Sequence, residues 1–303
     1  WSSDVCSSDL VEELGYIPNR TAGALASGHS DTVAVLVPSL TDKASSRFMQ
    51  SLQQVLNKNE FQLLLGCHEY NQLKEAEILM TLLQGNPAAL VIFGSQLADK
   101  THQILEKTNI PTINVVGSPF SPAQITIETA FFEASHKLTE HLLEQGYKNI
   151  GFIGAHMDNR LQRQQLNGWH KAMLSHYQNS DLVITMPDAA SLQLGRYALN
   201  EILLRQPELD AVICSHEEIA LGIMFECQRR LLKIPENIAV ACLDGSDNCD
   251  QTHPTLTSIR IDYKKMGIET GKLLIGLLNN NHDESEESRI VQFNYQIELR
   301  QST

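Results

Sequence analysis

Short apolar runs alternate with longer amphipathic stretches along the first part of the chain. Four runs are rich in β-branched residues, namely VAVLV (33–37), FQLLLG (61–66), AALVIF (88–93) and PTINVV (111–116). Between them, positions 47–58, 73–84 and 98–107 repeat apolar residues at helical spacing. Nearly continuous apolar strands that alternate with helices are typical of a parallel sheet covered on both faces. We therefore predict a doubly wound α/β unit in this part of the chain.

A second series of the same kind begins after Glu128. The pattern predicts helices at 131–145, 161–176, 191–205 and 217–232, and strands at 149–154, 181–185, 210–215 and 238–244. A tail from Ile259 adds a helix at 263–279, a solvated acidic loop and a strand near 290–295. The predicted fold class is α/β, with two doubly wound parallel-sheet lobes joined by crossover segments.

The length of 303 residues suits two lobes, because single cores usually stop growing at about 250 residues. We expect 31–128 plus 259–281 to form the N-terminal lobe, and 129–258 plus 288–303 to form the C-terminal lobe. Residues 1–10 repeat Ser-Ser-Asp without any helical or strand period. We interpret this segment as a sequence artefact or a disordered terminus, and we assign no function to Cys6.

Composition excludes several classes of function. A net charge of −13, from 23 basic and 36 acidic residues, is the opposite of a self-sufficient nucleic-acid binder. The cysteines have no CxxC pair, the histidines no metal-ligand spacing, and neither nucleotide-binding glycine loops nor GxSxG occur. No membrane-spanning run or signal peptide is visible. We therefore expect a cytoplasmic protein with reduced, mostly buried thiols, no cofactor, no metal and no enzymatic activity.

Candidate ligand-binding residues follow the predicted strands, because open α/β sheets bind ligands beyond the carboxyl ends of their strands. The candidates for effector binding are Ser39, Thr41, Tyr70, Ser95, Gln96, Arg160, Arg163, His216, Glu217 and Asp244. Such a set of hydroxyl, amide, carboxylate and guanidinium groups suits a polyhydroxylated or anionic small molecule. The structural alternative is strong, since Ser, Asp and Asn at these places are also ordinary helix N-caps.

The segment GYIPNRTAGALASG (15–28) carries the most specific motif. Its residues Tyr16, Pro18, Asn19, Arg20, Ala22 and Leu25 fall on a pattern that resembles the hinge of LacI/GalR-type transcription regulators. The resemblance implies a hinge helix that pairs with its dimer mate in the DNA minor groove, and an apolar wedge such as Leu25 would kink a base step there. Residues 11–30 would then be the end of the headpiece plus the hinge, and the recognition helix would lie outside this sequence. The alternative is an amphipathic helix that packs on the core.

The resemblance extends over nearly the whole chain from Val11, through GFIGAHMDNRLQRQQLNGWHKAM, EEIALGIMFECQRRLLKIPENIAVACLDGSD and PTLTSIRIDYKKMG. Within the family, gluconate-type repressors are the most similar. This implies a sugar or sugar-acid effector, whose carboxylate Arg160 or Arg163 could hold. Two positions depart from the family pattern, because Ala130-Phe131 stands where Asp-Asn is frequent and His216-Glu217 where Asn-Asp is frequent. These departures indicate a pocket with altered specificity.

The resemblance implies a homodimeric repressor that binds operator DNA through the hinge and headpiece, responds to an effector between its lobes, and contacts no membrane. The expected dimer surface involves the first helix of the first lobe and the 217–232 helix. Two other classes of function stay open at this point. A periplasmic-type sugar-binding protein shares the two-lobe architecture but would need a signal peptide in place of the hinge. An enzyme acting on a carbohydrate has no visible catalytic group to support it.

Overall fold

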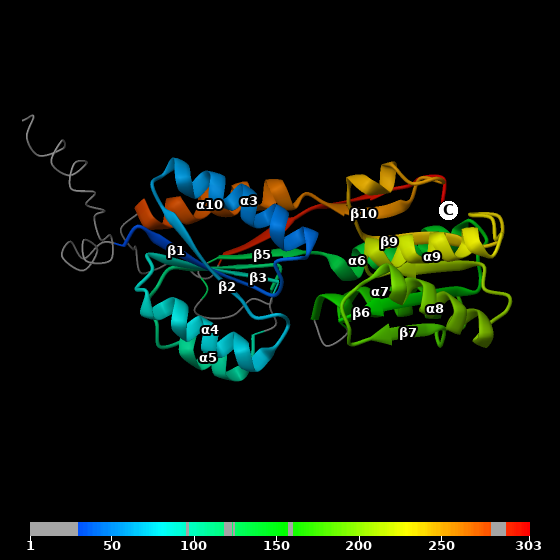
Figure 1. The fold of residues 1–303 in the computed structure, drawn as a ribbon, viewed down its shortest axis with the longest axis horizontal. Coiled ribbons are helices and arrows are strands. Elements are labelled where there is room, and N and C mark those ends of the chain that lie inside the picture. Colours follow the sequence, from blue (N-terminus) through cyan, green and yellow to red (C-terminus); the bar gives the residue numbers. More distant parts are fainter. Residues whose placement is uncertain (1–29, 95–96, 118–122, 124, 157–159, 280–288) are drawn as a thin grey trace, which may run out of the picture.

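The computed structural model describes residues 30–94, 97–117, 123, 125–156, 160–279 and 289–303. Several predictions lie outside these ranges: the segment 1–10, the hinge motif, and the candidates Ser95 and Gln96. Of the predicted hinge range 11–30, the structure describes Ser30 alone. The described chain forms two α/β lobes placed side by side (Figure 1).

The first lobe contains a six-stranded sheet in the order β11-β5-β4-β3-β1-β2, all of whose neighbours are parallel. Its strands are β1 (Thr32–Val37), β2 (Gln62–Cys67), β3 (Ala89–Phe93), β4 (Thr112–Val115), β5 (Ile125–Thr129) and β11 (Arg289–Phe293). Its helices are α3 (Lys43–Lys58), α4 (Gln72–Gln84), α5 (Asp99–Leu105) and α10 (Tyr263–Asn279). Buried apolar side chains pack on both faces of the sheet, as the continuous apolar runs predicted.

The second lobe contains a six-stranded sheet in the order β12-β10-β9-β8-β6-β7. Its strands are β6 (Ile150–Ala155), β7 (Val183–Met186), β8 (Ala211–Cys214), β9 (Ala239–Gly245), β10 (Thr257–Ile261) and the antiparallel edge strand β12 (Tyr295–Glu298). Its helices are α6 (Phe131–Glu144), α7 (Arg160–Ser175), α8 (Leu192–Arg205) and α9 (Glu217–Arg229), with a 3-10 turn η1 (Asp247–Asp250). The fold class predicted from the sequence is therefore confirmed.

The chain passes between the lobes at three places, and these places correct the expected lobe boundaries. The crossings follow β5, β10 and β11, so that each strand ends in one sheet and the next element belongs to the other lobe. The range 288–303 was expected wholly in the second lobe, but β11 is hydrogen-bonded to β5 of the first sheet. The start of the range 259–281 was expected in the first lobe, but β10 pairs with β9 of the second.

Strands β5 and β10 lie outside the predicted strands, because ITIET and TSIRI mix polar and apolar residues and lack a continuous apolar run. Both are crossing strands that carry buried polar side chains, for example Thr126 and Ser258. No helix within the described ranges is both long enough and apolar enough to cross a membrane.

Candidate functional site: the cleft between the lobes

A cavity of about 260 Å³ lies between the two lobes and is lined by residues from both. The first lobe contributes Pro38, after β1, and Gly94, after β3. The second lobe contributes His156, after β6, and His216, after β8. The cavity therefore occupies the crevice beyond the carboxyl ends of the parallel strands, where this fold class binds ligands.

Three ion pairs and one ring contact join the lobes across this cleft. The Lys43 Nζ atom, on α3 of the first lobe, lies 2.6 Å from Glu217 Oε1 and 3.0 Å from Glu218 Oε1, at the start of α9. Arg47, also on α3, lies 3.2 Å from Asp247 of η1. The Tyr70 ring stacks on the His156 imidazole with 4.1 Å between centroids. These contacts hold the lobes together, and they leave the two cations already neutralised by carboxylates.

Glu217 is a structural link rather than a wall of the cavity. It is 1% exposed, and its two oxygens also accept hydrogen bonds from the Ser246 backbone (2.7 Å) and the Asn248 side chain (3.0 Å). Burial alone would raise the pKa of this carboxyl, but these donors and Lys43 lower it instead. Glu217 thus remains charged and ties α3, α9 and η1 together.

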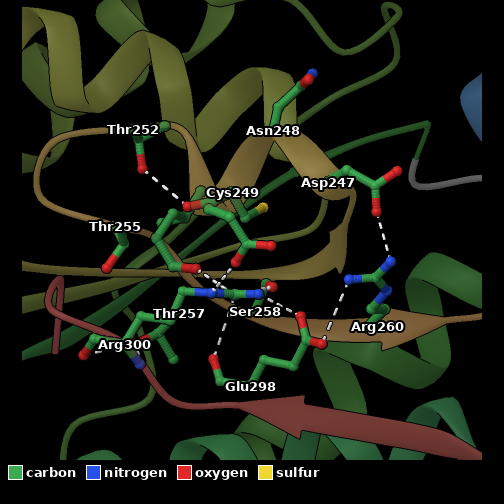
Figure 2. Close-up of polar contacts among 12 residues, drawn as sticks. Asp247, Asn248, Cys249, Thr252, Thr255, Thr257, Ser258, Arg260, Glu298 and Arg300 are labelled. Carbon is green, nitrogen blue, oxygen red and sulfur yellow. Dashed lines mark hydrogen bonds and ion pairs between the residues drawn. The ribbon is translucent and has the colours of Figure 1, made fainter.

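An ion-pair network supports the η1 turn at the rim of the cleft. Asp247 pairs with Arg260, which also lies 3.5 Å from Glu298, and Glu298 pairs in turn with Arg300 (Figure 2). Arg300 Nε also lies 2.6 Å from Asp250. The network connects the crossing strand β10 and the chain end to the same turn that receives Arg47 from the first lobe.

Two carboxylates of the cavity are each paired with a tyrosine. The Tyr70 hydroxyl donates a hydrogen bond to Asp42, and the Tyr263 hydroxyl donates to Asp244 over 3.5 Å. Burial, together with the negative charges of Glu218, Glu217 and Asp42, raises the pKa of Asp244 to about 7. At neutral pH, Asp244 is therefore divided between an acceptor-only carboxylate and a carboxylic acid that can donate.

The two histidines of the cavity are neutral. Burial, reinforced by the neighbouring His156, lowers the pKa of His216 to about 4, and burial also lowers the pKa of His156. His216 Nδ1 lies 2.7 Å from Ser215 Oγ, and its Nε2 lies 3.4 Å from Gln162 Nε2. A neutral imidazole offers one donor and one acceptor, which suits a hydroxyl group better than a second cation.

Two buried glutamines of α7 line the same cavity, and three of their four side-chain amide atoms lack hydrogen-bond partners. Gln162 is 4% exposed and its Oε1 is unpaired, while Gln165 is 1% exposed and neither its Oε1 nor its Nε2 is paired. Buried polar side-chain groups are almost always hydrogen-bonded in folded proteins, because an unpaired one costs about 1–3 kcal/mol. These amides therefore mark the part of the cavity where a polar ligand is missing from the hydrogen-bond network.

The raised pKa of Asp244 predicts a specific pH dependence. In the unfolded chain this carboxyl ionises near its ordinary pKa of 3.8, but in the folded chain only near 7. The folded state thus binds the extra proton between these values, so this group stabilises the fold below about pH 4 and loses that contribution as the pH rises to 7. We expect Asp244→Asn to be about 4 kcal/mol more stable than the wild type at pH 8, and to differ little from it at pH 4.

Urea unfolding of both proteins at pH 4, 6 and 8 measures this difference in stability. The lowered pKa of His216 makes stability rise with pH, but this effect is the same in both proteins and cancels in the comparison. A stability difference that does not change with pH would contradict the shifted ionisation of Asp244.

The structure brings together some of the predicted site residues and separates others. Thr41, Tyr70, His216 and Asp244 line the cleft cavity. The Ser39 hydroxyl is bonded to Thr41 Oγ1 (2.9 Å) and accepts the Thr41 N–H (3.1 Å), which is the local turn role weighed as the alternative. Arg160 lines an adjoining cavity instead, and Arg163 is exposed and is not among the residues lining either cavity.

Sequence reasoning missed Asp42, Lys43, His156, Gln162, Gln165 and Tyr263. For Gln162 and Gln165, a signal existed, because they stand three residues apart at the start of a helix that follows a strand and so share one face. Tyr263 could not be identified from the sequence as a site residue, because it follows β10, which was not predicted. Lys43 and Asp42 begin a helix whose predicted start was several residues later.

No group of three or more His, Cys, Asp and Glu side chains suited to a metal ion occurs among the residues that the structure describes. The cavity instead combines amides, hydroxyls, neutral imidazoles and carboxylates around a cleft. This chemistry suits binding of a hydroxylated molecule.

Comparisons with known proteins agree with the fold and the cleft. Residues 139–303 match the family described as a periplasmic binding protein-like domain. The crystal structure of a PurR family transcriptional regulator from Vibrio parahaemolyticus is 40% identical, with a TM-score of 0.82 over 89% of this chain and 98% of that chain.

Two further relatives lie at lower identity. The HTH-type transcriptional regulator GntR of Escherichia coli K12 is 29% identical over 85% of this chain and 77% of its own length. The structure of the lac repressor dimer bound to operator, 21% identical with a TM-score of 0.84 over 98% of this chain and 88% of that chain, shows the shared fold. The chain therefore belongs to the LacI/GalR-type family of transcription regulators and carries their periplasmic-binding-protein-like core.

Proposed function

We propose that this regulator controls genes of carbohydrate or sugar-acid use, and that its effector binds in the cleft between the lobes. The observation that carries the proposal is a pair of buried glutamines at the wall of the cleft, in which Gln162 Oε1 and both amide atoms of Gln165 lack partners. A hydroxylated ligand supplies both donors and acceptors to such amides. The names of relatives such as GntR and IdnR of Escherichia coli agree with a regulator of this class.

The effector acts by changing how the lobes are held together. Lys43 and Arg47 already bridge the cleft, so a ligand that binds the glutamines, Tyr70 and Asp244 contributes further contacts to this closed arrangement. A ligand shifts a conformational equilibrium only by its difference in affinity for the two states. The relative position of the lobes then sets the geometry of the segment 11–30, which we propose contacts operator DNA with its motif Tyr16 to Leu25.

A homodimer in the bacterial cytoplasm, associated with the nucleoid, completes the proposal. The structure of the lac repressor is that of a dimer bound to operator. In this chain, exposed apolar side chains occur on the edge strand β2, at Leu64 and Leu65 (38% each), and on α9, at Phe225 (48%). An exposed apolar strand edge is a common pairing surface, so we propose β2 and α9 as parts of the dimer contact. No catalytic role is proposed.

A thermal-shift screen tests the proposed function. The chain is melted with D-gluconate, L-idonate, related aldonates and neutral hexoses, each across a concentration series. A ligand at one hundred times its dissociation constant stabilises the native state by about 2.7 kcal/mol, which raises the melting temperature by several degrees. We expect a saturating, dose-dependent rise with at least one sugar or sugar acid. The absence of any such rise across the panel would contradict a carbohydrate effector.

A further inference from the structure

A second cavity of about 220 Å³ adjoins the cleft at the place where the chain first crosses between the lobes. Its polar lining comprises Glu128, Thr129, Glu133, Arg160, Gln164 and Gln292. It shares Val116, Phe131 and Leu161 with the wall of the cleft cavity, so the two cavities are neighbours.

The N-terminus of α6 lines this cavity and has no side-chain cap. The N-cap residue is Ala130, which makes no capping hydrogen bond, and the first-turn residues Phe131, Phe132 and Glu133 all line the cavity. The first N–H groups of a helix have no partner within the helix, and the aligned peptide dipoles give this end a partial positive charge. The first turn of α6 therefore presents unpaired N–H donors at this cavity.

Two side chains add donors beside the helix end. Thr129 is 8% exposed, and its hydroxyl has no hydrogen-bond partner. The Arg160 guanidinium makes no ion pair or hydrogen bond with any residue of the described ranges. A buried hydroxyl without a partner is a rare feature of native structures and indicates a missing ligand or water.

The cleft cavity itself is a poor place for a negative charge. Asp42, Glu218 and Asp244 line it, whereas Lys43 and Arg47 are paired with carboxylates of the second lobe. A carboxylate placed there would meet like charges without an unpaired cation. The hydroxyl groups of a ligand, in contrast, can donate to these same carboxylates.

We propose that the adjoining cavity is a subsite for the carboxylate of a hydroxy-acid effector, formed by the N-terminus of α6, the Thr129 hydroxyl and Arg160. The proposal rests on the proposed function, and adds that this subsite separates acids from neutral sugars. Glu128, bonded to Gln292 over 3.0 Å, and Glu133 limit the positive charge of the subsite. It therefore fits a single carboxylate flanked by hydroxyls better than a doubly charged phosphate.

Calorimetric titration with two probes of the same carbon skeleton tests the subsite. D-gluconate carries a carboxylate where D-glucitol carries a hydroxymethyl group, so only gluconate uses the subsite. We expect Arg160→Gln to weaken gluconate binding at least tenfold and to leave any glucitol binding unchanged. Arg163→Gln is the matched control, because it removes the same charge from an exposed position of the same helix.

A second variant is expected to weaken gluconate binding while it stabilises the fold. Ala130→Asp places a capping carboxylate at the N-terminus of α6, which satisfies its N–H groups and fills the subsite with negative charge. We expect this variant to melt at a higher temperature than the wild type while its gluconate affinity falls at least tenfold, so that lost binding cannot be ascribed to unfolding.

Three results would overturn the subsite. They are the absence of gluconate binding to the wild type, gluconate binding unaffected by Arg160→Gln and Ala130→Asp, and an equal loss of glucitol and gluconate binding in Arg160→Gln. Each result leaves the proposed function intact if a neutral sugar still stabilises the wild type, and the thermal-shift screen decides that point separately.

Discussion

Replacing Gly168 with valine is expected to destabilise the second lobe by about 3 kcal/mol or more. Gly168 lies in α7 where this helix crosses α6, and a Cβ atom there would come within 2.3 Å of the Phe132 carbonyl oxygen and 3.0 Å of the His136 backbone nitrogen. Because these are backbone atoms, no side-chain rotation relieves the clash, and the two helices must separate. The effect extends to function, since α7 also carries Gln162, Gln165 and Arg160.

Gly276→Val is the matched control for this prediction. Gly276 lies in α10, is exposed, and has no atom within 4 Å of an added Cβ. Melting curves of the two variants are compared with the wild type, and for a lobe of this size about 3 kcal/mol lowers the melting temperature by about 6–12 °C. Equal melting temperatures for Gly168→Val and Gly276→Val would contradict the close packing of α6 on α7.

The strands of both sheets were predictable from the sequence because burial on both faces leaves an apolar signature. VAVLV and AALVIF became β1 and β3, and both are buried throughout or nearly so. Strands β5 and β10 have no such signature, since buried polar side chains interrupt their apolar runs. The fold class is therefore visible in local patterns, whereas the crossings depend on contacts between distant segments.

The site residues also differ in whether local sequence patterns or contacts between distant segments determine their position. His216 and Asp244 could be found because they stand at the carboxyl ends of β8 and β9, and the edge at which parallel strands end is fixed by the fold. The direction in which each side chain points could not be predicted from the sequence. Glu217, adjacent to His216, is buried against Lys43 and is not part of the cavity wall. Charge alone was also misleading for Arg163, because an arginine at the right helix can still face solvent.

Burial without a partner was the property least accessible from the sequence. Gln165 is an ordinary helix-forming residue in a polar stretch, and only the apposition of α7 with the remainder of the cleft removes it from water. The same holds for Thr129, which is buried at a crossing that local patterns do not reveal. Both residues are candidates for ligand contact because their polar side-chain atoms are buried without a hydrogen-bond partner.

The measurement that tests the central claim most directly combines melting and titration of Gln165→Leu. Leucine fills a similar volume but removes both unpaired amide atoms, each of which costs about 1–3 kcal/mol when buried without a partner. We expect the free variant to melt at least about 4 °C above the wild type, while its affinity for the ligand found in the thermal-shift screen falls about a hundredfold. Gln54→Leu, at an exposed position of α3, is the control and should change neither property.

A variant with a higher melting temperature and a lower ligand affinity is the result expected when a buried polar group serves to bind a ligand. A Gln165→Leu variant that is more stable and no longer binds the ligand would support the cleft as the effector site. A variant that binds the ligand as tightly as the wild type would contradict it.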